Sequence, residues 1–186
     1  GMVISLLQLL QYGRLQPWPH RRLFMKPQSI LQQERSAVDV SEVSDTEILA
    51  EYVKRFTIKA GESIRSAKDA ASHLRAFFSD ASKKEKFVVI FLNGQHQVLT
   101  TEVLFAGSLT TSAVFPREVI TRVIDLGAAA VIFGHNHPSG LTTPSNSDRA
   151  VTKKLQTALT AIDVEVLDHV ILGGNEHFSF ADHRLL

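Results

Sequence analysis

The stretch "FGHNHPSGLTTPSNSD", residues 133–148, lies between an apolar run and a segment with a helical pattern. The apolar run "AAAVIFG", residues 128–134, has the length and character of a buried central strand. The Pro-Ser-Gly that follows predicts a turn, and Ser145 and Asp148 have the S-x-x-D spacing of a helix cap. The stretch therefore predicts a strand, a loop and a helix in succession.

Two histidines end the predicted strand, and they indicate a metal site. His135 and His137 are two residues apart, so on an extended backbone their side chains project to the same side. The first turn of the following helix faces back toward this strand end and carries Asp148. Two imidazoles and a carboxylate supply three ligands to Zn²⁺ and leave the fourth tetrahedral position to a water molecule, whose pKa then falls to about 7. The alternative is purely structural: Ser145 and Asp148 only cap the helix.

Hydrophobic spacing on both sides of this stretch alternates between helical and strand patterns. Before it, the sequence predicts two helices, a pair of strands around Asn93-Gly94, and a helix that Pro116 opens and Gly127 closes. After it, the sequence predicts a helix that ends near Thr160 and then two strands. The predicted order is α, α, β, β, α, β, α, β, β, which is typical of an α/β (α+β) protein with a mixed β-sheet flanked by helices.

Composition excludes several classes of protein. The chain has 186 residues, enough for one good core, and its net charge of +1 predicts no overall attraction to nucleic acid or to an anionic membrane. It has no cysteine, which excludes disulfides, cysteine zinc fingers, thiol nucleophiles and zinc deaminases. The apolar segment 3–13 is too short to span a bilayer and lacks the features of a signal peptide. We therefore expect a cytoplasmic protein with no membrane partner.

The N-terminal segment has an uneven distribution of charge. Residues 14–35 carry five basic residues and one acidic residue, whereas residues 39–51 carry five acidic residues and no basic one. One interpretation is an arm that binds nucleic acid. The other is that residues 2–24 are an extension produced by a start codon assigned too early. The more ordinary sequence that begins at Met25 suggests this second interpretation. The composition leaves both open.

The motif around the two histidines resembles that of a known family. "HNHPSG" from His135, followed by "PSNSD" to Asp148, looks like the JAMM (JAB/MPN) metalloprotease motif in the form carried by the RadC-like family. The flanking stretches "EVLFAGSL", "FPREVI", "LDHVILGG" and "FSFADHRLL" agree in order and spacing, over about residues 84–186. The resemblance is strongest to short RadC-like proteins of mobile elements and antirestriction operons. It implies a JAB/MPN, cytidine-deaminase-like fold of three layers.

The resemblance also implies roles for individual residues. His135, His137 and Asp148 match the family's metal ligands, and Ser145 matches the serine that helps hold the oxyanion. The family's general base is a glutamate at the start of the first core strand, where this chain has Glu85, and Glu102 on the paired strand is the alternative. These roles imply a Zn²⁺-dependent metallopeptidase that acts on a peptide or protein.

A second functional class competes with the hydrolase. Because longer RadC proteins are associated with DNA repair, the chain is alternatively an accessory protein of DNA repair or antirestriction, with a structural or vestigial metal site. No basic patch in the sequence supports DNA binding. The oligomeric state is open, and a homodimer is one alternative.

The helical spacing that begins at Asp45, together with the extent of the resemblance, divides the chain into three segments. We expect an N-terminal arm over 1–44, a helical lead-in over 45–82 that consists of N-terminal helices, and the RadC-like metal-binding domain over 83–186.

The remaining histidines are less informative. His169 follows Asp168 on a predicted strand, where it either orients a metal ligand or forms an ordinary buried pair with that aspartate. Four further histidines show no ligand spacing and are predicted to lie on the surface: His73, His96, His177 and His183.

Overall fold

In the computed structural model, residues 43–78, 84–107 and 115–186 are described, and all of them belong to a unit that spans Val40–Leu186. The arm expected over 1–44 lies almost entirely outside these residues, so its predicted role stays a prediction. The order of helices and strands matches the predicted order. The elements are α1 (Asp45–Phe56), α2 (Ala67–Arg75), β1 (Lys86–Leu92), β2 (Val98–Ala106), α3 (Pro116–Leu126), β3 (Ala130–Asn136), α4 (Asn146–Thr160), β4 (Glu165–Gly173) and β5 (Glu176–Ser179).

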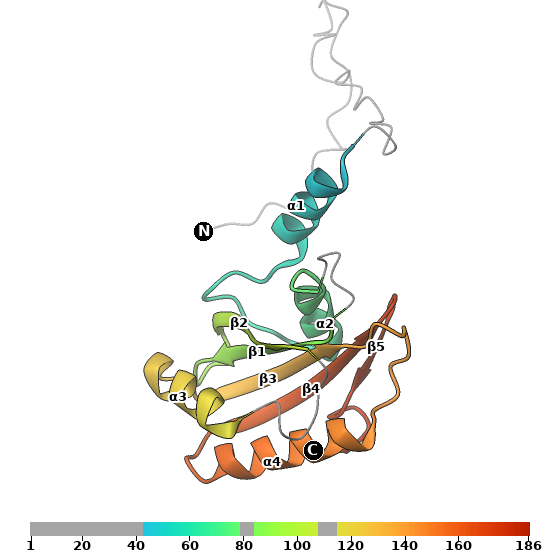
Figure 1. Cartoon of the computed structure of the whole chain (residues 1–186). Helices are drawn as coiled ribbons and strands as arrows, with labels where there is room; N and C mark the ends of the chain where they lie inside the picture. Colours follow the sequence, from blue (N-terminus) through green and yellow to red (C-terminus); the bar gives the residue numbers. More distant parts are fainter. Residues whose placement is uncertain (1–42, 79–83, 108–114) are drawn as a thin grey trace, which may run out of the picture. The chain divides into compact units, whose positions relative to one another are not determined.

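The five strands form one mixed sheet in the order β2-β1-β3-β4-β5. Strands β3 and β4 are parallel, and the other neighbouring pairs are antiparallel. The predicted strand over 128–134 is therefore the central strand β3, as its continuous apolar run indicates. Because β3 and β4 are parallel, their carboxyl ends lie at the same edge of the sheet, and helix α4 begins beside that edge (Figure 1).

Helices cover both faces of the sheet, which gives three layers. Helix α2 lies on one face, and α3 and α4 lie on the other (Figure 1). Alternate residues of β1 pack into the hydrophobic cores on the two faces of the sheet. Phe87, Val89 and Phe91 pack with α3 and α4, whereas Val88, Ile90 and Leu92 pack with α2. An α/β fold with a mixed sheet is thus confirmed, and burial of both faces explains why β1 and β3 read as uninterrupted apolar runs.

A glycine in β3 permits helix α2 to approach the sheet closely. A methyl group at Gly134 would lie 2.5 Å from a terminal methyl carbon of Leu74, which is fully buried. The glycine in "FGHNH" is therefore a requirement of packing. Helix α3 begins at Pro116 and is followed by Gly127 in the left-handed conformation, with φ of 62°, as the sequence predicts.

The β1–β2 hairpin is confirmed, but its turn is longer than the Asn-Gly pair around which it was predicted. Strand β1 ends at Leu92 and β2 begins at Val98. The side-chain oxygen of Asn93 accepts hydrogen bonds from the backbone N–H groups of Gln95 (2.9 Å) and Gln97 (3.0 Å). This side chain organises a wider turn, in which the positive φ falls on His96.

The prediction that His73 lies on the surface is wrong. His73 is only 2% exposed, because it lies on the buried face of α2. Its Nδ1 accepts a hydrogen bond from the backbone N–H of Ile58 (2.8 Å), and its Nε2 lies 2.8 Å from the hydroxyl of Thr101. Burial lowers the pKa of His73 to about 4. The imidazole is therefore a neutral structural link between α2, β2 and the segment after α1.

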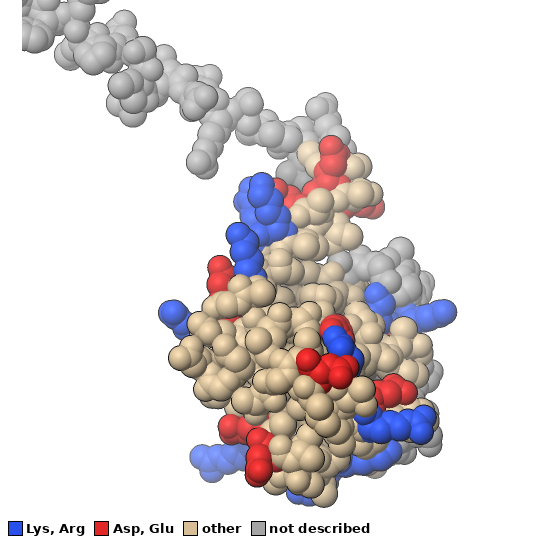
Figure 2. Space-filling model, turned by 90° about the vertical axis from the view of Figure 1, so that its left-hand side faces the viewer, with Lys and Arg blue, Asp and Glu red and all other residues tan. Residues whose placement is uncertain are grey.

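Surface charge is dispersed on the face drawn in Figure 2. Lysine and arginine side chains lie there among acidic ones on a largely uncharged surface. Among the helices of the described ranges, none has the length and apolar character needed to cross a membrane.

Candidate metal centre

The three predicted ligands meet where β3 ends and α4 begins. His135 is the second-last residue of β3 and is fully buried, and Asp148 lies in the first turn of α4 and is 3% exposed. His137 follows the end of β3, and its side chain is 14% exposed. A shielded histidine and carboxylate thus sit behind a histidine that reaches the surface.

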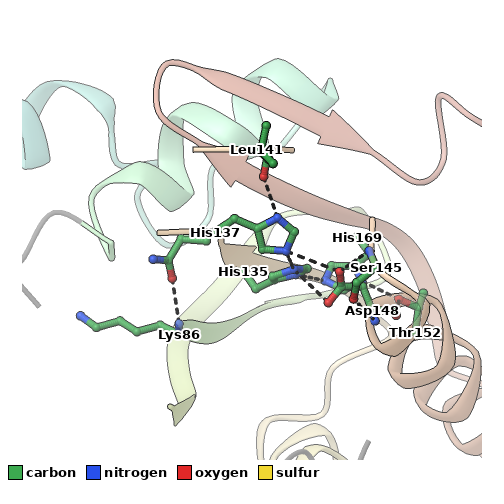
Figure 3. Close-up of polar contacts among 9 residues, drawn as sticks. Lys86, His135, His137, Leu141, Ser145, Asp148, Thr152 and His169 are labelled. Carbon is green, nitrogen blue, oxygen red and sulfur yellow. Dashed lines mark hydrogen bonds and ion pairs between the residues drawn. The ribbon is translucent and has the colours of Figure 1, made fainter. Parts of the chain in front are cut away.

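The ligand atoms of the three side chains lie close enough together to surround one ion. Nε2 of His135 lies 2.9 Å from Nε2 of His137 and 3.2 Å from Oδ1 of Asp148, and Nε2 of His137 lies 3.4 Å from Oδ2 of Asp148 (Figure 3). A tetrahedral zinc ion with bonds of about 2.0–2.2 Å separates its ligand atoms by about 3.3–3.6 Å. The two separations between histidine and aspartate are close to this range and the separation between the two histidines is shorter, and the three side chains form a His/His/Asp group that could hold a metal ion.

The tautomer of His137 is set by the loop after β3. Its Nδ1 lies 2.6 Å from the carbonyl oxygen of Leu141 (Figure 3). A carbonyl oxygen only accepts hydrogen bonds, so Nδ1 carries the proton and donates it. Nε2 of the neutral ring is then left with a lone pair that points toward His135 and Asp148.

The tautomer of His135 is set by a relay of hydrogen bonds that ends on helix α4. The hydroxyl of Thr152 donates to the main-chain oxygen of Asp148 (2.6 Å) and lies 2.6 Å from Nδ1 of His169. A hydroxyl has a single proton, so Nδ1 of His169 must donate to Thr152. Nε2 of His169 then accepts from Nδ1 of His135, at 2.8 Å.

Both ligand histidines therefore present unprotonated Nε2 atoms to each other. Two lone pairs at 2.9 Å repel, and a cation between them removes the repulsion. Ordering of a histidine ligand through its other ring nitrogen is a general feature of metal sites. The donor set and its tautomers thus fit a divalent ion that binds imidazole and carboxylate.

The electrostatic environment favours the protonation states that metal binding needs at His135, His169 and Asp148. Burial lowers the pKa of His135 and holds that of His169 well below its usual value, so both rings stay neutral. Burial raises the pKa of the Asp148 carboxyl, but its contacts with His135 and His137 outweigh burial and hold that pKa well below its usual range. Contact with the Asp148 carboxylate, which only accepts hydrogen bonds, raises the pKa of His137. Asp148 is therefore ionised and can neutralise part of the charge of a cation.

Ser145 is the residue before α4, and it fixes Asp148 in two ways. Its hydroxyl oxygen accepts from the backbone N–H of Asp148 (3.1 Å), and its own backbone N–H donates to Oδ2 of Asp148 (2.7 Å). This is the capping box that the S-x-x-D spacing predicts. The cap and the metal group are thus not alternatives, because the cap orients the carboxylate toward the two histidines.

Glu85 lies directly before β1, beside the end of β3. The side chain of Asn136 forms hydrogen bonds with the backbone on both sides of Glu85. Its oxygen accepts from the backbone N–H of Lys86 (2.8 Å), and its NH₂ donates to the carbonyl of Lys84 (3.2 Å). Burial lowers the pKa of His135, and contact with Asp148 raises that of His137; the negative charge of Glu85 makes a small contribution that raises both. The backbone around Glu85 is thus held by Asn136, the residue between the two histidines.

Glu102, the alternative base, is held elsewhere. It pairs with Val89 in the β1–β2 register, and both of its carboxylate oxygens accept from the guanidinium of Arg122 on α3, at 2.8 and 2.5 Å. Its hydrogen bond with Arg122 lowers its pKa. This ion pair makes Glu102 a weaker candidate than Glu85.

Sequence reasoning left the role of His169 open and missed three residues that support the candidate centre. The His169 ring contacts the candidate ligand His135, whereas Asp168 accepts from the hydroxyl of Ser179 at 2.6 Å and from the backbone N–H of His169 at 2.7 Å. The supporting groups of Thr152, Asn136 and Leu141 were not foreseen. Thr152 follows Asp148 by one helical turn, which is a visible signal, whereas the contacts of Asn136 and Leu141 depend on the path of the chain in space.

Comparison with known proteins finds several similar chains. The YfjY and YeeS proteins of Escherichia coli (strain K12), both UPF0758 proteins, are 49% and 50% identical to this chain over 104 residues, which make up 56% of it. The UPF0758 protein VP0184 of Vibrio parahaemolyticus is 40% identical over 126 residues, or 68% of this chain. The matched parts cover 65%, 70% and 56% of these three relatives, respectively.

A family model described as the RadC-like JAB domain matches residues 64–185. The match begins inside the lead-in expected over 45–82 and includes α2, whose residues pack against the sheet. It covers the whole candidate metal centre and well over half of the chain. The chain therefore belongs to the RadC-like JAB domain family.

Proposed function

We propose that this protein is a zinc-dependent hydrolase that cleaves amide bonds in a peptide or protein, with His135, His137 and Asp148 as the zinc ligands. The proposal rests on three side chains whose ligand atoms approach each other to 2.9–3.4 Å, with the lone pairs of the two Nε2 atoms facing each other. Three protein ligands leave a fourth position for a reacting molecule, which is typical of catalytic zinc sites.

Zinc, when bound, polarises a carbonyl group and lowers the pKa of a water molecule to about 7. The protein's own residues then move the protons. Glu85 accepts the proton of the attacking water and passes it to the leaving amine. Asn136 supports this role because it holds the peptide groups on both sides of Glu85. Ser145 accepts a hydrogen bond from Asp148, so its own hydroxyl proton remains for the oxyanion.

The test combines metal analysis with hydrolysis of a peptide library. Wild-type protein and Glu85→Gln should each contain about one zinc ion per chain, and Asp148→Ala should lose it because one of three protein ligands is gone. Only the wild type should hydrolyse the library. Zinc without hydrolysis in the wild type would favour the accessory-protein alternative with a structural metal. Hydrolysis by Glu85→Gln would show that the base is another residue.

A further inference from the structure

A groove of about 600 Å³ opens beside the candidate metal centre. Its walls come from helix α1, from α2 and the residue Phe78 beyond it, from the loop after β3, and from the end of β4. We call it the α1 groove. Its apolar and aromatic lining consists of Ile48, Leu49, Tyr52, Phe78, Pro138 and Leu172. The volume lies within the range of about 300–1,000 Å³ that is typical of ligand sites.

The groove and the candidate metal centre share a wall. His137 lines the groove, and its Nε2 belongs to the ligand group. Asn136, which holds the chain on both sides of Glu85, lines the groove as well. A peptide whose amide group lay at this centre would therefore have a neighbouring residue close to the groove.

Helix α1 forms the outer wall with an apolar face that is incompletely covered. None of its residues is buried, and Ile48 is 43% exposed although it faces the groove. The hydroxyl of Tyr52 donates to the main-chain oxygen of Ser72 at 3.1 Å, which ties α1 to α2. An apolar occupant would remove this exposed surface from water, which is favourable. Helix α1 also lies outside the residues that the family model matches, so this wall is an addition to the matched domain.

The charges of the groove do not select a charged occupant. The two charged side chains that line it are Asp45 and Arg75, which have opposite signs. The guanidinium of Arg75 donates to the main-chain oxygens of Gly174 and Asn175, so it is already engaged with the β4–β5 turn.

We propose that the α1 groove binds a large apolar side chain, such as leucine or phenylalanine, directly next to the scissile bond of a peptide substrate. This inference rests on the proposed function and adds the substrate class to it. Apolar lining, balanced charge and the shared residue His137 each point to such an occupant.

The test measures peptide binding apart from hydrolysis, and it uses the full chain with the Glu85→Gln substitution and bound zinc. The probes are pools of fluorescent peptides in which one central position is leucine, phenylalanine, serine or lysine and the others are randomised. The leucine and phenylalanine pools should bind about 10- to 100-fold more tightly than the serine pool, because the side chain leaves water. In the wild type, mass spectrometry should find leucine or phenylalanine beside the cleaved bond.

A matched pair of variants tests whether the preference for apolar peptides arises in the α1 groove. Ile48→Lys should remove the preference for apolar pools, whereas Ile124→Lys, at an exposed isoleucine (67%) on α3 that does not line the groove, should retain it. Both variants should keep zinc and an unchanged Tm. Equal binding of all four pools, or a preference that survives Ile48→Lys, overturns the groove proposal. Selective binding without any hydrolysis by the wild type supports the groove and contradicts the hydrolase.

Discussion

Gly173, the last residue of β4, lies against the loop that carries Leu141. A methyl group at Gly173 would lie 2.5 Å from the carbonyl oxygen of Gly140, 2.7 Å from its carbonyl carbon and 3.0 Å from the carbonyl carbon of Leu141. All three are backbone atoms, so no change of side-chain rotamer relieves the contact. Gly173→Ala must therefore displace the loop. The same loop holds His137, whose Nδ1–H donates to Leu141 and whose backbone N–H donates to Leu172 at 2.7 Å.

The size of the displacement sets the expected loss of zinc affinity. Contacts below 3.0 Å are essentially never seen for a β-carbon, so the Gly140 carbonyl must move by about 0.5 Å or more. A movement of this size lengthens or breaks the 2.6 Å hydrogen bond between His137 and Leu141. Loss of a partner that orients a metal ligand typically weakens metal binding about 10- to 100-fold, or by about 1.4–2.7 kcal/mol. Competition with a chelator of known affinity measures the change.

The control for Gly173→Ala is a glycine substitution that affects stability alone. Gly127 follows α3 with φ of 62°, and nothing lies within 4 Å of the position where a methyl group would be added. Gly127→Ala should lower the free energy of unfolding by about 1 kcal/mol through backbone strain and leave zinc affinity unchanged. If Gly173→Ala binds zinc as tightly as the wild type, the loop does not orient His137 as inferred.

Three further predictions concern the supporting structure. Thr152→Val removes the hydroxyl that fixes the tautomer of His169, so zinc affinity in the same chelator assay should fall about tenfold; an unchanged affinity would contradict the relay. His73→Asn should flatten the decline of stability in acid, measured by urea unfolding at several pH values. His73 is protonated near pH 6.5 in the unfolded state but only near pH 4 in the folded state. Its contribution to the free energy of unfolding is therefore complete above pH 6.5. Up to about 3 kcal/mol of that free energy is lost as the pH falls toward 4. Gly134→Ala should destabilise the protein by about 1–3 kcal/mol through overpacking. The double variant with Leu74→Ala should lose less free energy of unfolding than the sum of the losses in the two single variants. Strictly additive losses would argue against the close contact between α2 and β3.

Local patterns in the sequence were sufficient for the order of elements and for the convergence of the ligand group. The i, i+2 spacing of His135 and His137 and the S-x-x-D cap before Asp148 both act over a few residues, so they can be read without a structure. His73 was misplaced although a local signal existed: it lies three residues after Ala70 and one before Leu74, within the buried face of α2. The length of the β1–β2 turn depends instead on the side chain of Asn93, which competes with the tight turn that Asn-Gly otherwise favours.

The partners of the two histidines could not be read from the sequence, because they depend on which strands are neighbours. His169 reaches His135 only because β3 and β4 pair in parallel, with Phe133 opposite His169 and His135 opposite Ile171. A chain of hydrogen bonds runs from Nδ1 of His135 through His169 and Thr152 to the main-chain oxygen of Asp148. On the other side of the His135 ring, Nε2 lies 3.2 Å from the carboxylate of Asp148. This buried chain joins β3 and β4 to the first turn of α4, so a change at any member shifts the atoms that would bind the ion.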